Sequence, residues 1–69
     1  MSRREIEAII DEWITGHQAE RNRQILKRRL IDGIRFELLA EEFDLSDKQV
    51  KRIVYREMER IEKHRKEVG

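Results

Sequence analysis

FELLAEEFDLSDKQVKRIVY, residues 36–55, is the stretch that decides the fold. Two helical runs flank a short polar segment. Two helices that cross steeply at a tight turn require particular residue types at particular positions. Ala40 supplies the small residue that is needed where the second helix packs closely over the first. Four residues later, Asp44 occupies the turn position that wants a positive φ, which aspartate tolerates at some cost. The stretch therefore predicts a helix-turn-helix.

The residues that follow Asp44 indicate how the second helix is oriented. Leu45 is expected to bury its side chain in the angle between the helices, and Ser46 to cap the second helix. Val50 and Ile53 then pack back onto the first helix, so helical geometry turns the opposite side to solvent. The residues expected on that exposed side are Asp47, Lys48, Lys51, Arg52 and Tyr55.

Outside this stretch the composition favours helix nearly throughout. Proline and cysteine are absent and charged residues make up 45% of the 69-residue chain, so neither strands nor disulfides are expected. The fold class predicted is an all-α, four-helix single domain. Its expected helices are Arg3 to Thr15 (capped by Ser2 and ended by Gly16), Gln18 to Ile31, Arg35 to Phe43, and a last helix that starts after Ser46 and reaches Lys66.

The predicted domain organisation has three parts. Residues 1–16 form an N-terminal amphipathic helix that packs on the domain, residues 17–66 form the helix-turn-helix domain, and residues 67–69 form a frayed tail. The net charge is only +1, but the signs are segregated, with eight basic and five acidic side chains in residues 46–69. A chain that is nearly neutral overall can still present one basic face.

A basic exposed helix in this setting points to duplex DNA as the partner. The N-terminal part of such a helix enters the major groove, where lysine and arginine favour guanine acceptors and aspartate accepts from a cytosine amino group. The residues expected at base edges are Asp47, Lys48, Lys51 and Arg52. Those expected on the DNA backbone are Arg35, Ser46, Gln49 (on phosphate or adenine), Tyr55 and Arg56, with Lys27 or Arg28 as further phosphate contacts.

Residues from about 20 to 63 resemble the C-terminal (region four) domain of bacterial RNA polymerase sigma factors. The matching features are the Leu-Ile-Asp-Gly turn at 30–33, the Leu-Ala-Glu-Glu segment at 39–42, and the Ser-x-x-x-Val-x-x-Ile helix that begins at Ser46. The whole chain is similar to small free-standing sigma-like helix-turn-helix proteins of bacterial chromosomes and mobile elements. The resemblance implies promoter-type recognition of DNA by the last helix, with base-reading residues at Asp47, Lys48, Lys51 and Arg52.

The chain departs from that family in two respects. It has no segment like the promoter-melting or the main polymerase-binding region of a full sigma factor, so it is not expected to open a promoter alone. The Arg-Glu pair that is common in sigma recognition helices is replaced by Asp47-Lys48. The function expected is sequence-specific binding of double-stranded DNA, as a transcriptional regulator or sigma-like accessory factor.

The alternative is a protein-interaction module that docks on RNA polymerase or another regulator and binds little DNA. An apolar stripe carries this alternative, because it is either core or a surface for polymerase or for a homodimer through the N-terminal helix. The stripe consists of Ile6, Ile9, Ile10, Trp13 and Ile14.

Other chemistry is not expected. Glu41 and Glu42 are adjacent on a helix and diverge, so they form no acid/base dyad, and no nucleophile motif is present. His17 and His64 lack metal-ligand spacing. The chain is therefore expected to be no enzyme and to need no cofactor or metal. Without a long apolar run or a signal-peptide pattern, it is expected in the cytoplasm with no membrane partner.

Overall fold

The computed structural model describes residues 2–68, with side chains placed for residues 2–63. This part of the chain contains four helices and no strand, which confirms the all-α, four-helix expectation. The helices are α1 (Arg3–Trp13), α2 (Ala19–Leu30), α3 (Phe36–Phe43) and α4 (Asp47–Val68).

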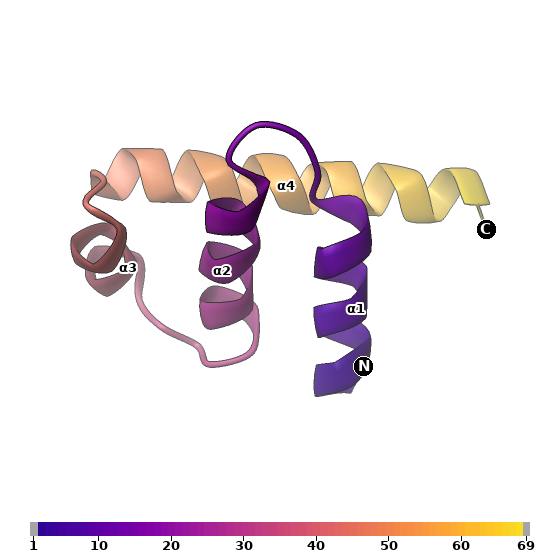
Figure 1. The fold of residues 1–69 in the computed structure, drawn as a ribbon, viewed down its shortest axis with the longest axis horizontal. Coiled ribbons are helices and arrows are strands. Elements are labelled where there is room, and N and C mark those ends of the chain that lie inside the picture. Colours follow the sequence, from indigo (N-terminus) through magenta and orange to yellow (C-terminus); the bar gives the residue numbers. More distant parts are fainter. Residues whose placement is uncertain (1, 69) are drawn as a thin grey trace.

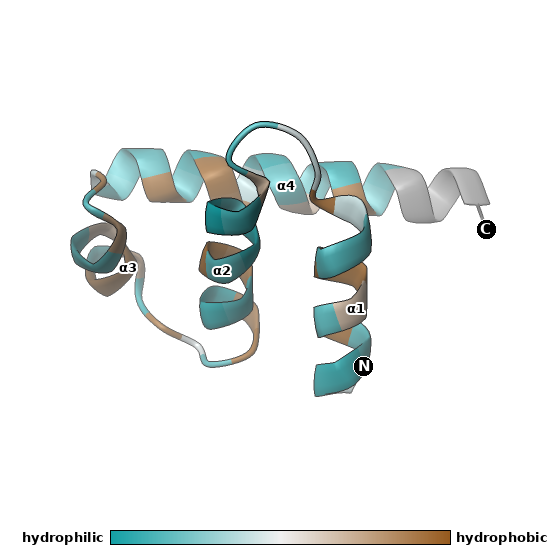
Figure 2. Cartoon of the chain, in the orientation of Figure 1, coloured by the Kyte–Doolittle hydropathy of each residue, from teal (hydrophilic) through white to brown (hydrophobic). Residues whose placement is uncertain are grey.

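The long α4 organises the molecule. Figure 1 shows α1 and α2 side by side, running in opposite directions across α4, and α3 at the N-terminal end of α4. The helix packs against each of the other three, and α1 and α3 each also contact α2. Hydrophobic and hydrophilic residues alternate along every helix in Figure 2, as expected of helices with one buried face.

A single cluster of apolar side chains holds the four helices together. Full burial of one such aliphatic side chain stabilises a fold by about 1.5–3 kcal/mol at most. All four helical segments contribute to the cluster, so none of them buries its apolar face alone. The buried members are Ile10 and Ile14 from the α1 segment, Ile25 and Leu26 from α2, Leu39 and Ala40 from α3, and Val50, Ile53, Val54 and Ile61 from α4.

The first helix begins as expected and ends earlier than expected. The Ser2 hydroxyl accepts a hydrogen bond from the Glu5 backbone N–H at 3.2 Å, which confirms Ser2 as the N-cap. The helix ends at Trp13 rather than Thr15, because Ile14 adopts an extended conformation and is fully buried. The Arg23 side chain donates to the Ile14 carbonyl at 2.8 Å and fixes this exit. Gly16, with φ +90°, lies in the following loop instead of capping the helix.

The other helices differ from expectation by one or two residues at their ends. Helix α2 starts and stops one residue inside the predicted bounds, and α3 starts one residue after Arg35, which caps it. Helix α4 runs to Val68, so the backbone of residues 67 and 68, expected as part of a frayed tail, is helical. Gly69 and the side chain of His64 lie outside the described residues.

The connection between α3 and α4 is short and has the predicted strained residue. Asp44 has φ 56° and ψ 48°, the left-handed region predicted for this position. The turn is closed by hydrogen bonds from Asp44 N–H to the Glu41 carbonyl at 3.4 Å and from Leu45 N–H to the Ala40 carbonyl at 2.8 Å. Ala40 is 4% exposed where α4 packs on α3, and Leu45 packs against the same cluster. The turn thereby fixes the crossing of α3 and α4.

Candidate functional site

The structure brings together five of the predicted site residues on the outer face of α4, a name used here for Asp47, Lys48, Lys51, Arg52 and Tyr55. All five side chains are exposed. Their exposure follows from the opposite side of the helix, where Val50, Ile53 and Val54 are buried. The outer face therefore presents three cations, one carboxylate and one aromatic ring within the first nine residues of α4.

The basic side chains of this face have no counter-ion among the side chains that the structure describes. Among the residues whose side chains the structure describes, no carboxylate pairs with Lys48, Lys51 or Arg52, nor with Arg35, which directly precedes α3. Arg35 is exposed and the first turn of α3 has no side-chain cap, so its backbone N–H groups are open to an anion. These four cations are free to engage a negatively charged partner.

Two other predicted phosphate contacts are already paired. Lys27 Nζ lies 2.7 Å from Asp11 Oδ1 and joins α2 to α1. Arg28 Nε lies 2.6 Å from Glu42 Oε2 and joins α2 to α3. Both pairs are partly exposed, so each stabilises the fold by about 1 kcal/mol or less. The charges of Lys27 and Arg28 are nevertheless locally compensated. Lys27 and Arg28 are weaker candidates for an anionic partner than Arg35.

Ser46 and Gln49 form a reciprocal cap at the start of α4. The Ser46 hydroxyl accepts from the Gln49 backbone N–H at 3.1 Å, and the Gln49 side-chain oxygen accepts from the Ser46 backbone N–H at 2.9 Å. The Ser-x-x-Gln spacing is the sequence signal for this capping box, yet Gln49 was interpreted as a partner-binding residue. Its amide oxygen is occupied in the structure, which leaves the amide N–H₂ as its free donor group.

An aromatic and cationic corner borders the outer face, and sequence reasoning missed it. The Phe36 ring is half-buried and lies 6.0 Å from the Tyr55 ring in an edge-on arrangement. The Arg29 guanidinium sits 4.3 Å from the centre of the Phe36 ring, and Lys51 Nζ sits 5.8 Å from it. Cations at such distances are attracted by the ring face. Phe36 thereby restrains Lys51 on the side of α4 that faces α3.

Arg56 lies at the edge of the outer face, beside a buried acid that was not predicted. Its Nε is 3.5 Å from Glu57 Oε1, and Arg60 Nη1 is 3.6 Å from Glu57 Oε2. The Glu57 side chain is only 3% exposed. The helical period held the signal for this burial, because position 57 follows Val50 by seven residues and Ile53 by four.

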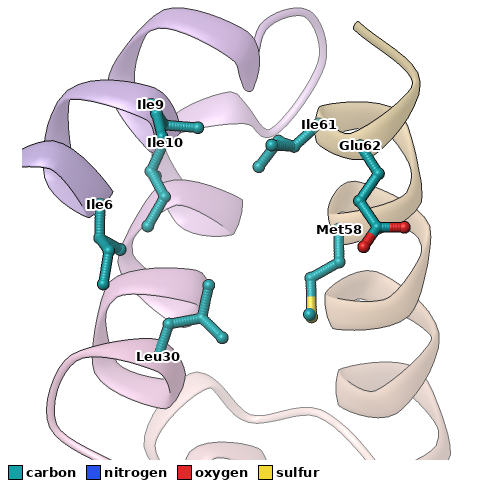
Figure 3. A pocket seen from close by; sticks show the side chains of 7 residues that line it. All are labelled: Ile6, Ile9, Ile10, Leu30, Met58, Ile61 and Glu62. Carbon is teal, nitrogen blue, oxygen red and sulfur yellow. The ribbon is translucent and has the colours of Figure 1, made fainter. Parts of the chain in front are cut away.

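An apolar hollow of about 280 Å³ opens between α1, the end of α2 and α4. Figure 3 shows Ile6, Ile9, Ile10 and Leu30 facing Met58 and Ile61 across it. Leu30 and Met58 are 38% and 37% exposed. Within the described residues, the N-terminal apolar stripe is thus divided. Ile10 and Ile14 are buried in the core, while Ile6, Ile9 and Trp13 are half-buried.

The described part of the chain shows no group of three or more metal-ligating side chains. Nor do these residues include a helix with the length and apolarity needed to cross a bilayer. Comparisons of the chain with protein-family models, with curated proteins and with solved structures give no match. Any functional conclusion therefore rests on the residues and geometry described above.

Proposed function

We propose that this chain binds double-stranded DNA sequence-specifically, using α3, the turn and α4 as a helix-turn-helix, and acts as a transcriptional regulator or sigma-like accessory factor. One observation carries the proposal. Lys48, Lys51 and Arg52 are exposed and unpaired among the described side chains, turned away from Val50 and Ile53 on the buried side of α4. A helix held in this way is free to lie in a major groove.

The outer face of α4 supplies groups suited to base edges. Lys48 and Arg52 are one helical turn apart, and both donate to the guanine acceptors O6 and N7. Asp47 accepts from a cytosine amino group. Lys51 is drawn toward Phe36, so in this proposal it reads bases nearest the α3 side of the groove. Tyr55 lies beyond them and contacts the sugar-phosphate backbone.

The first turn of α3 supplies the complementary hold on the backbone. Arg35 and the uncapped N–H groups of this turn together suit a phosphate. The exposed carboxylates of Glu37, in the same turn, and of Glu41 and Asp44, farther along, repel a phosphate backbone. The proposed contact is therefore confined to Arg35 and the N–H groups beside it. Ser46, Gln49 and Arg56 flank the other side of α4 and contribute backbone contacts through their remaining donors. Contacts of this kind position the protein without reading sequence.

The test is selection of binding sites from a random duplex pool with two matched variants. Lys48→Ala/Arg52→Ala removes two unpaired cations from the outer face of α4, and Arg4→Ala/Lys63→Ala removes two exposed, unpaired cations elsewhere among the described side chains. Each good base contact is worth about 1–3 kcal/mol. We therefore expect the first variant to lose motif enrichment while the second keeps it. Equal enrichment with both variants, each shown by circular dichroism to be folded, rejects the outer face as the reading surface.

The apolar hollow favours a second candidate function, docking on RNA polymerase or another regulator. Leu30 and Met58 stand exposed at its rim, and Ile6, Ile9 and Ile61 line it. Apolar hollows with a polar surround are typical of protein-binding surfaces. If this candidate is correct, Leu30→Glu/Met58→Glu abolishes co-purification with polymerase, and the interaction persists at high salt. DNA binding through phosphates, by contrast, weakens steeply with salt. A homodimer through the N-terminal helix would appear instead as concentration-dependent mass in sedimentation.

A further inference from the structure

A second hollow lies on the side of α4 nearest the loop between α1 and α2. It is lined by residues 15–18 of that loop, by Arg21 and Asn22 of α2, and by Arg56, Glu57 and Arg60 of α4. Figure 1 shows this loop arching at the middle of α4. None of the five residues of the outer face of α4 lines the hollow. It is therefore a separate feature of the surface.

The charges around the hollow do not balance. Arg56 and Arg60 share the single carboxylate of Glu57, at 3.5 and 3.6 Å. Arg21 donates from Nε and Nη2 only to the neutral Asn22 side-chain oxygen, at 3.3 Å in both cases. Three guanidinium groups thus surround one carboxylate. Two positive charges have no counter-ion among the described residues that line the hollow.

The start of α2 adds donors at the same place. Gln18 has φ 61° and makes no side-chain cap. Ala19 N–H donates to the Gly16 carbonyl and Asn22 N–H to the Gln18 carbonyl. Between them, among the described residues, the backbone N–H group of Arg21, which lines the hollow, finds no backbone acceptor. Unpaired N–H groups at a helix N-terminus favour an anion.

Glu57 is buried beside the two α4 arginines, at 3.5 Å from Arg56 and 3.6 Å from Arg60. Its side chain is 3% exposed, and its Oε2 is buried without a hydrogen-bond partner. A buried carboxylate is costly unless donors satisfy it. Each guanidinium has five N–H donors, so Arg56 and Arg60 can donate inward to Glu57 and outward to a ligand together.

We propose that this hollow binds the phosphate group of a small phosphorylated ligand, held by Arg21, Arg56, Arg60 and the N-terminus of α2, with Glu57 positioning the two α4 arginines. A phosphate monoester carries close to two negative charges at neutral pH. That charge matches the two uncompensated guanidiniums, and arginine forks suit phosphate oxygens.

The hollow adjoins the surface proposed to contact DNA and shares Arg56 with it. With about 100° of rotation per residue, Arg56 and Arg60 lie about 40° and 80° around α4 from Arg52. Arg21 and Arg60 are the arginines of the hollow to which no DNA contact is assigned. A DNA phosphate is the other source of the same chemistry, and the experiment below distinguishes it.

The test is an NMR titration of the isotopically labelled full chain with pyrophosphate, at constant ionic strength set by chloride. We expect saturable shifts of the backbone amides of residues 16–21. The variant Arg21→Gln/Arg60→Gln is expected to weaken binding at least tenfold. The control Arg4→Gln/Lys63→Gln removes the same charge outside the hollow and leaves the titration unchanged. Arg21→Gln alone leaves the Arg56 and Arg60 contacts of Glu57 intact. Its weaker binding of pyrophosphate can therefore be measured even if the double variant is poorly folded.

Three results overturn the proposal. One is the absence of saturable shifts in residues 16–21. Another is an equal loss of pyrophosphate binding in the control variant, which would show a general charge effect. The third concerns DNA. If Arg21→Gln/Arg60→Gln lowers affinity for the selected duplex far more than Arg4→Gln/Lys63→Gln does, the arginines hold the DNA backbone instead of a separate ligand. Equal DNA affinities for the two variants, together with the selective loss of pyrophosphate binding, support the separate site.

Discussion

Asp44 is the one residue of the turn between α3 and α4 that sits in a conformation unfavourable to its type. It has φ 56° and ψ 48°, and its side chain is exposed. Glycine adopts this conformation without a steric penalty. We predict that Asp44→Gly raises the free energy of unfolding by about 0.5–1 kcal/mol, whereas Asp44→Val lowers it. Urea denaturation followed by circular dichroism measures both. Destabilisation by the glycine variant would show that the Asp44 side chain, and not the backbone angle, sets the turn.

Ser46 and Gln49 test whether the reciprocal cap starts α4. Each side chain accepts from the other's backbone N–H, at 3.1 and 2.9 Å. We predict that Ser46→Ala lowers the free energy of unfolding by about 1 kcal/mol. The loss caused by Gln49→Ala is expected to be smaller once Ser46 is already alanine, since the two bonds cooperate. A double-mutant cycle in urea gives the coupling. Strictly additive losses contradict a shared cap.

At the scale of the helices, Ala40 sets how closely α4 approaches α3. It is 4% exposed at their contact. We predict that Ala40→Leu lowers the free energy of unfolding by about 1–3 kcal/mol, because the added atoms force the two helices apart. On the same helix, Leu38 is 53% exposed, and Leu38→Ala serves as the control with a change of about 0.5 kcal/mol or less. A near-neutral Ala40→Leu would mean that the crossing is loose.

The existence of the four helices followed from sequence more readily than their ends did. Periodic apolar positions and the Ser2 cap predict α1, because both signals lie within the residues of the helix and its first turn. Its end depends on Ile14 turning into the core and on Arg23 reaching the Ile14 carbonyl. That contact joins segments distant in sequence, so no local pattern at residues 13–16 reports it. The left-handed Asp44 was predictable because the requirement lies within the turn itself.

In the candidate site, too, features set by local sequence were predictable, and features set by contacts between helices were not. The outer face of α4 was predictable, because burial of Val50 and Ile53 leaves one side of the helix to solvent. The pairing of Lys27 with Asp11 and of Arg28 with Glu42 was not, since it depends on how α2 packs against α1 and α3. Glu57 was predictable in principle from the helical period, but a charged residue on a core face is easily assigned to solvent.

For the molecule as a whole, the net charge of +1 conceals a local excess of cations. Lys48, Lys51, Arg52 and Arg35 have no counter-ion among the described side chains. We predict that log K for specific DNA falls as log salt rises, by about 0.9 for each phosphate that a cation neutralises. Arg35→Ala is expected to make that slope shallower by about 1, because Arg35 is the one of these four cations proposed to contact a phosphate. Fluorescence anisotropy across a salt series measures both, and a slope near zero contradicts DNA binding.

The two sides of α4 are under different constraints, one from folding and one from binding. This difference affects which substitutions the chain can accept during evolution. One side supplies Val50, Ile53, Val54 and Ile61 to the core, while positions 47, 48, 51 and 52 contribute nothing to it. Selection on mutations at these four positions therefore acts mainly through the binding partner and hardly through the stability of the fold. A library randomised there is expected to consist mostly of folded members, which makes this 69-residue chain a small scaffold for acquiring new target preferences.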